Sequence, residues 1–268
     1  YIMDMDLIGA PGQSVLAGEA AGKIETAVSA DKNVFISGKN SGVKYEGVNT
    51  GSADIVSQSE NVYILGEDNG IYANSQAEEE ITGYKKAGNL AKHNINVKSN
   101  NGSVYVGYFA GDSNNNGNGI FNSGRNDISL EAKDLVVVQG GNTALNVKKE
   151  TNTIVKGKDV VINSYGYGIK SEGVNNVTIG YTEADNKQTD SVIISGKIGV
   201  DTIANNLGKK DVTSDYIRDS DTDRLIDGEN NTINIRANNI DINADDCALN
   251  VSQEATAKGS DDNADIYT

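Results

Sequence analysis

Residues 60–72 read ENVYILGEDNGIY. Val62 and Ile64 alternate with Tyr63, and a polar, glycine-containing turn then leads to a second apolar stretch at Ile71. A period of two predicts a short strand in which Val62 and Ile64 face inward and Tyr63 faces outward. A large aromatic side chain on the outward face needs an explanation, and similar stretches elsewhere in the chain provide the comparison.

The same order of residues occurs seven times: a short polar residue, then apolar, variable and apolar positions. The copies begin at Asn33, Asn61, Ser103, Asp134, Asp159, Ser191 and Asn239. Each copy is followed by a small residue and then an aliphatic one. These steps are Gly42-Val43, Gly70-Ile71, Gly119-Ile120, Ala144-Leu145, Gly168-Ile169, Gly199-Val200 and Ala248-Leu249. Another short strand precedes each copy, so we expect units of three strands joined by tight turns.

The repeat predicts a solenoid. The linkers are rich in Gly, Asn, Asp and Ser, which suit turns, and they are too short to hold a crossover helix between neighbouring strands. Each unit is therefore expected to make one turn, with equivalent strands stacked in parallel about 4.8 Å apart. The predicted fold is all-β: a parallel β-helix of about seven coils with loop and short-helix insertions.

Two columns of equivalent residues follow from this alignment. The inward column of the middle strands is predicted to be Val34, Val62, Val104, Leu135, Val160, Val192 and Ile240. The polar residues that open the seven copies form the column before it. Short polar side chains can bond to backbone at a turn, and stacked asparagines can form ladders, so we expect this column to be structural.

Insertions are expected at residues 73–93, 108–118, 181–190 and 204–228. The first carries a weak helical signal, the third suggests a polar hairpin, and the fourth is the longest and most acidic. Residues 1–22 are expected to form an earlier coil or cap, and residues 23–268 the β-helix. Because the final ADIYT resembles ADIVS at 53–57, another coil is expected to begin near Ile266, as in a fragment of a longer solenoid.

Composition excludes several classes of protein. With 38 Asp+Glu against 23 Lys+Arg, the net charge is −15, and such a surface repels phosphate backbones, which argues against nucleic acid as a partner. A single cysteine excludes an internal disulfide and a Cys-rich zinc site. No run of 18 apolar residues occurs, so we expect no membrane insertion by this segment. Nothing in the sequence indicates a cofactor.

The irregular coils, the Asn/Gly/Ser-rich turns, the scarcity of Cys, Pro and Trp, and the acidic balance resemble right-handed parallel β-helix proteins. In composition the chain is most similar to the passenger domains of bacterial autotransporters and related surface adhesins, over about residues 23–252. The resemblance implies right-handed coiling and secretion to the bacterial cell surface, with an outer-membrane anchor in a C-terminal region beyond this sequence. It also implies adhesion to a protein or glycan on a host or neighbouring cell, and self-association along the rod.

The candidate binding residues are Phe35, Tyr63 and Tyr105, which we expect to form an outward aromatic strip. The outward column of the middle strands is predicted to be Phe35, Tyr63, Tyr105, Val136, Val161, Ile193 and Asp241. The outward column of the first strands is mostly polar, comprising Glu25, Val56, Asn96, Ser129, Val155, Thr178 and Asn234. An exposed apolar stripe usually marks cover or contact. There are two alternative explanations. The insertions could fold over the stripe, or β-branched residues could occur there because they suit a flat parallel sheet.

Two loops have spacings that could hold calcium. Asp219, Asp221 and Asp223 alternate in DSDTD, but Arg224 stands where an EF-hand has glycine. The segment from Asp112 to Gly117 begins like a calcium loop but lacks the later glutamate. Solvated loops are the alternative in both cases, so metal binding stays open.

Catalysis is the main rival to adhesion, because polysaccharide-degrading enzymes such as pectate lyases share the β-helix. We recognise no catalytic constellation. His93 is expected at the surface of an insertion, Asp245 and Asp246 in a turn, and Cys247 buried and inert. The sequence thus favours an adhesin over a polysaccharide-degrading enzyme, with a structural spacer stalk as a third interpretation.

Overall fold

The computed structural model describes residues 23–47, 50–75, 92–108, 117–173, 175–207 and 231–256. In these ranges the chain consists of strands and turns with one short 3₁₀ helix, η1 (Glu183–Asp185), and every strand pairing is parallel. No helix in them is long and apolar enough to cross a membrane. The all-β, parallel class expected from the sequence is confirmed.

The strands fall into three sets that recur in order along the chain. The first strands form a seven-stranded sheet: β1 (Lys23–Ala30), β4 (Thr50–Ser57), β7 (His93–Ser99), β10 (Asp127–Ala132), β13 (Thr151–Lys156), β16 (Asn175–Ile179) and β18 (Thr232–Ile235). The middle strands are β2 (Val34–Gly38), β5 (Val62–Gly66), β8 (Val104–Tyr108), β11 (Leu135–Gln139) and β14 (Asp159–Asn163). The third strands are β3 (Ser41–Gly47), β6 (Asn69–Ser75), β9 (Asn118–Ser123), β12 (Thr143–Lys148) and β15 (Tyr167–Glu172).

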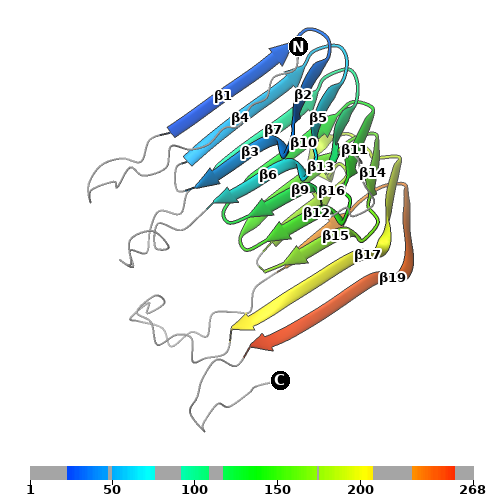
Figure 1. The fold of residues 1–268 in the computed structure, drawn as a ribbon. Coiled ribbons are helices and arrows are strands. Elements are labelled where there is room, and N and C mark those ends of the chain that lie inside the picture. The colour runs from blue at the N-terminus through cyan, green and yellow to red at the C-terminus, as the bar shows by residue number, and fades with distance from the viewer. Residues whose placement is uncertain are drawn as a thin grey trace, which may run out of the picture.

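Two long strands, β17 (Ser191–Leu207) and β19 (Asn239–Thr256), continue both the middle and the third sets. Each therefore bends where its predecessors have a separate turn. Strands of one set lie side by side and the three sets enclose a common interior, so the described chain is a stacked solenoid (Figure 1).

The inward column of the third strands matches the sequence alignment in every copy. Register pairs its members from one unit to the next. They are Val43, Ile71, Ile120, Leu145, Ile169, Val200 and Leu249. All but Leu249 are buried. Burial of one such side chain is worth roughly 1.5–3 kcal/mol, so the stacking of coils creates the core that no single coil has.

The middle strands require one correction. Val136, not Leu135, pairs with Val104 and Val160 and is fully buried, whereas Leu135 is half-buried and pairs with Asp159. Leu135 therefore occupies the position in the polar column at which Asp134 was expected. A one-residue slip exchanges the two faces of a strand, and the run LVVV allows both registers.

The first strands also differ from the alignment in part. Asn96, Ser129, Thr178 and Asn234 occupy one outward column as expected. Their true neighbours in it are Ala27, Asp54 and Ile154 instead of Glu25, Val56 and Val155. Val155 is fully buried. Glu25 and Val56 lie on the outward face two residues from the column, and the adjacent apolar residues Ile154 and Val155 do not reveal which of them faces inward.

The polar column before the middle strands is structural, as expected. Asn33 Oδ1 accepts the backbone N–H of Asn61 at 3.0 Å, and Asn61 Oδ1 accepts that of Ser103 at 2.8 Å. Each side chain thus satisfies a backbone donor of the next coil, at a corner where sheet hydrogen bonding is interrupted.

Three of the four expected insertions are shorter than the sequence suggested, and the insertion at 181–190 has the expected bounds. Residues 73–75 end β6, His93 begins β7, Tyr108 ends β8, Asn118 begins β9, and residues 204–207 belong to β17. Residues 181–190 form a loop with the η1 turn instead of a hairpin. Four expected features lie outside the described residues: the helix in 73–93, both calcium loops, the cap at 1–22 and the coil near Ile266. Only Gly117 and the strand residues just named are described.

Candidate functional site

The outward column of the middle strands is a continuous apolar stripe. Register aligns its members across neighbouring strands. We call Phe35, Tyr63, Tyr105, Val137, Val161 and Ile193 the outward stripe. Val137 takes the place expected for Val136, and Asp241 follows Ile193 in the column. Five steps of the sheet spacing give a stripe about 24 Å long.

The structure brings the three predicted binding residues together. The rings of Tyr63 and Tyr105 stack with centroids 5.0 Å apart and planes 6° apart, and Phe35 lies 5.9 Å from Tyr63 at a tilt of 42°. Stacking occupies the ring faces, so the strip presents ring edges and the two tyrosine hydroxyl groups. Such a surface offers apolar contact and hydrogen bonding together.

The stripe is open to solvent at both ends among the described residues. Phe35 is 43% exposed and Ile193 is 38% exposed. The four members between them are half-buried. Asn61 Nδ2 donates to the Tyr63 hydroxyl at 3.0 Å and holds that ring in its column. Whether an insertion covers the stripe is a question that falls on residues outside the described ranges.

A second aromatic pair lies on the outward side of the third strands and was missed by the sequence analysis. Tyr72 and Phe121 stack with centroids 5.1 Å apart and planes 11° apart. Lys44 Nζ lies 5.7 Å from the Tyr72 ring centre. Both rings directly follow the small–aliphatic step, so the tripeptides GIY and GIF were the signal that could have revealed them.

The loop 181–190 forms ion pairs with residues of two first strands, β10 and β13, and with the residue that follows a third, β18. Lys187 pairs with Glu131 of β10 at 3.0 Å, and Asp185 with Lys156 of β13 at 2.7 Å. Arg236, which follows β18, pairs with Glu183 at 3.3 Å. Because the anchors come from different coils, the loop acts as a strap across the end of the first-strand sheet.

The ion pairs of the strap shift the pKa values of its members. The hydrogen bond from Lys156 lowers the pKa of Asp185 to about 2, although burial opposes it, and hydrogen bonds from Thr182 lower the pKa further. Partial burial alone would raise the pKa of Glu131, but Lys187 and Lys98 lower it overall. Both carboxyl groups are therefore charged at neutral pH.

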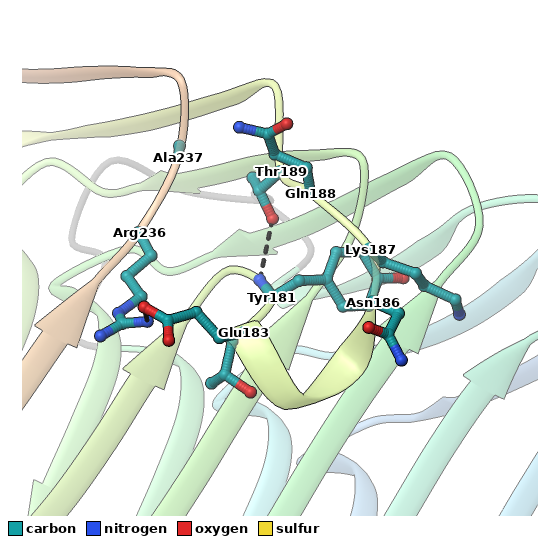
Figure 2. A pocket seen from close by; sticks show the side chains of 9 residues that line it. Tyr181, Glu183, Asn186, Lys187, Gln188, Thr189, Arg236 and Ala237 are labelled. Carbon is teal, nitrogen blue, oxygen red and sulfur yellow. Dashed lines mark hydrogen bonds and ion pairs between the residues drawn. The ribbon is translucent and has the colours of Figure 1, made fainter.

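A polar pocket of about 460 Å³ opens beside the strap (Figure 2). Its lining comes from the strap and from the turn after β18, and consists of Tyr181, Thr182, Glu183, Asn186, Lys187, Gln188, Thr189, Arg236 and Ala237. The wall is fixed by buried contacts. Tyr181 donates its backbone N–H to Thr189 Oγ1 at 3.0 Å and its hydroxyl to the Ala132 carbonyl at 3.1 Å. Burial raises the pKa of Tyr181.

The residues considered for catalysis are not brought together. His93 is 2% exposed at the start of β7, with its ring 5.4 Å from that of Tyr45, so the expected surface position is wrong. Asp245 and Asp246 lie in β19 at a register shift opposite Lys197, not in a turn. Cys247 is half-buried instead of buried. The described ranges hold no group of three or more His, Cys, Asp or Glu that could bind a metal ion.

Comparison with known proteins found no matching family model, no similar curated protein and no similar solved structure.

Proposed function

We propose that this chain is part of the passenger region of a bacterial surface adhesin, built as a right-handed parallel β-helix of about seven coils. The outward stripe is the observation that carries the proposal. A soluble protein seldom leaves a continuous apolar column on its surface without a partner, and aromatic side chains are enriched where proteins make contact.

The stacked scaffold supports this role. Ring stacking, the Asn61 bond to Tyr63 and the paired strands fix the stripe before any partner arrives, so binding loses little conformational entropy. Equal spacing along the stripe offers several weak contacts at once, which add through multivalency. The partner is a protein or glycan on a host or neighbouring cell, and the net charge of −15 disfavours nucleic acid.

The location belongs to the same proposal: the chain is secreted and held at the outer membrane by a region beyond this sequence. The polysaccharide-degrading and spacer readings have no specific observation in their favour.

The proposal is tested by coating beads with the purified chain and counting beads that remain on cultured cells and on bacterial lawns after washing. Beads coated with an unrelated acidic protein of similar size are the control for charge. Retention well above the control, blocked by excess soluble chain, is expected. Retention equal to the control on every surface contradicts adhesion. Release of reducing sugar ends from polysaccharide by the same preparation would favour the enzyme instead.

A further inference from the structure

The pocket beside the strap differs in charge from the chain as a whole. Its lining carries two cations, Lys187 and Arg236, against one carboxylate, Glu183, in a chain whose net charge is −15. Each lining cation has a carboxylate partner, Glu131 for Lys187 and Glu183 for Arg236, so the pocket is locally balanced and repels an anion less than the acidic surface as a whole. Lys187 is committed to Glu131 at 3.0 Å, so Arg236 is the cation left to receive a ligand.

Arg236 is weakly held by its present partner. One contact of 3.3 Å joins Arg236 Nη1 to Glu183 Oε1, and the side chains are 54% and 93% exposed. Ion pairs this exposed contribute little to stability, because water screens both charges. A guanidinium has five donors and binds a carboxylate through two parallel hydrogen bonds, so a ligand carboxylate can replace Glu183. Figure 2 places the two side chains together at one side of the pocket.

The rest of the lining suits hydroxyl groups. Asn186 and Gln188 bring amide groups that both donate and accept hydrogen bonds, and Ala237 offers a small apolar contact. A volume of about 460 Å³ lies within the range of small-ligand sites and accommodates one or two sugar rings.

The pocket is also preorganised. The pairs Lys187–Glu131 and Asp185–Lys156 fix one wall, and Thr189, itself 1% exposed, donates to the Gly157 carbonyl at 2.9 Å at its base. A wall held in place by several coils loses little freedom on binding.

We propose that this pocket binds an acidic sugar, with the sugar carboxylate on Arg236 and its hydroxyl groups on the strap amides. The site is separate from the outward stripe, and its failure would leave the adhesin proposal unaffected. The occupant is a carboxylated pyranose, either free or at the end of a glycan chain.

The test uses amide chemical shifts of the ¹⁵N-labelled chain. Galacturonate, glucuronate and N-acetylneuraminate, each as its methyl glycoside, are titrated into the millimolar range expected for single sugars. Methyl galactoside and methyl glucoside are the uncharged controls. We expect at least one acidic sugar to shift the amides of residues 181–189 and 236–238, and the neutral sugars to leave them unchanged. No shift from any acidic sugar, or equal shifts from the neutral ones, overturns the proposal.

Two variants with opposite expected effects separate binding from a structural role. Arg236→Gln should weaken binding of the acidic sugar about tenfold or more, because it removes the paired donors. Glu183→Gln should strengthen it several-fold, because the competing carboxylate is gone. Arg125→Gln is the matched control, since Arg125 is likewise exposed and paired with one glutamate, Glu150. Equal affinity in Arg236→Gln and Arg125→Gln contradicts the assignment.

Discussion

At the scale of single residues, the fold depends on which side chains of each strand enter the interior. Val136 and Leu135 show how narrow that choice is, because both precede further valines and either alternation reads as a strand. The structure selects Val136. The corner before the strand is one residue shorter in this coil. Ser99 pairs with Ala132, and Ser103 occupies the same position in its coil as Leu135. Four positions separate Ser99 from Ser103, but only three separate Ala132 from Leu135, so Val136 takes the inward position.

This register predicts unequal effects of two adjacent substitutions. Val136→Ala removes buried methyl groups and should cost about 2 kcal/mol of stability. Leu135→Ala, at a half-buried outward position, should cost less than about 1 kcal/mol. Urea denaturation followed by circular dichroism measures both. A larger loss for Leu135→Ala would contradict the register.

Asp185 predicts a dependence of stability on pH. Its pKa is lowered from the ordinary value of 3.8 to about 2 in the folded chain, chiefly by Lys156. The unfolded chain therefore takes up the proton first as pH falls, and the stabilisation, present above about pH 4, is lost as pH approaches about 2. Asp185→Asn should lower the melting temperature near neutral pH, and the difference from wild type should shrink toward pH 2. A difference that stays constant with pH would contradict this account.

At the scale of elements, the small residue at the second position of β3, β6, β9, β12 and β15 has a steric cause. A Cβ atom on Gly168 would lie 2.5 Å from the Gly199 carbonyl oxygen of the next unit, and one on Gly119 would lie 2.6 Å from that of Ala144. The corner backbones of neighbouring coils approach too closely for a larger side chain. This contact explains why the small–aliphatic step recurs in the sequence.

Gly168→Ala should therefore destabilise the chain by about 1–3 kcal/mol, the usual effect of forcing extra volume into a packed site. Gly107→Ala is the matched control, because its Cβ would meet its nearest atom, the Gln139 carbonyl oxygen, at 3.1 Å, which is a much milder conflict. Thermal melts of the two variants compare them directly. Equal melting temperatures would remove the steric explanation.

The sequence predicted the third-strand column fully because a steric requirement marks each corner with a small residue. It predicted the middle strands except at Leu135, since nothing local distinguishes the two alternations of LVVV. The first strands were less predictable, because Glu25 and Val56 share the outward face with the true column and Ile154-Val155 fits either alternation. The position of the strap was predicted as the insertion 181–190, but its ion pairs and its pocket could not be, because Glu131, Lys156 and Arg236 are far apart in sequence and reach the strap only through stacking.

At the scale of the whole molecule, stacking converts a sequence repeat into long surface columns. A residue such as Tyr63, unremarkable in one strand, becomes part of a stripe about 24 Å long because Phe35 and Tyr105 occupy the same position in adjacent coils. The same geometry gathers ion pairs from several coils around the strap. Both proposed sites, the outward stripe and the pocket beside the strap, are therefore built from residues of more than one coil.

The central claim is that the aromatic part of the outward stripe makes the adhesive contact. The most direct test compares bead retention on cells for wild type, Tyr63→Ser/Tyr105→Ser and Tyr72→Ser/Phe121→Ser. The last pair loses an equivalent ring stack from a different set of strands. Circular dichroism must show all three proteins folded. The account predicts about tenfold lower retention for Tyr63→Ser/Tyr105→Ser alone, as expected for loss of aromatic contact residues. Wild-type retention by that folded variant would contradict it.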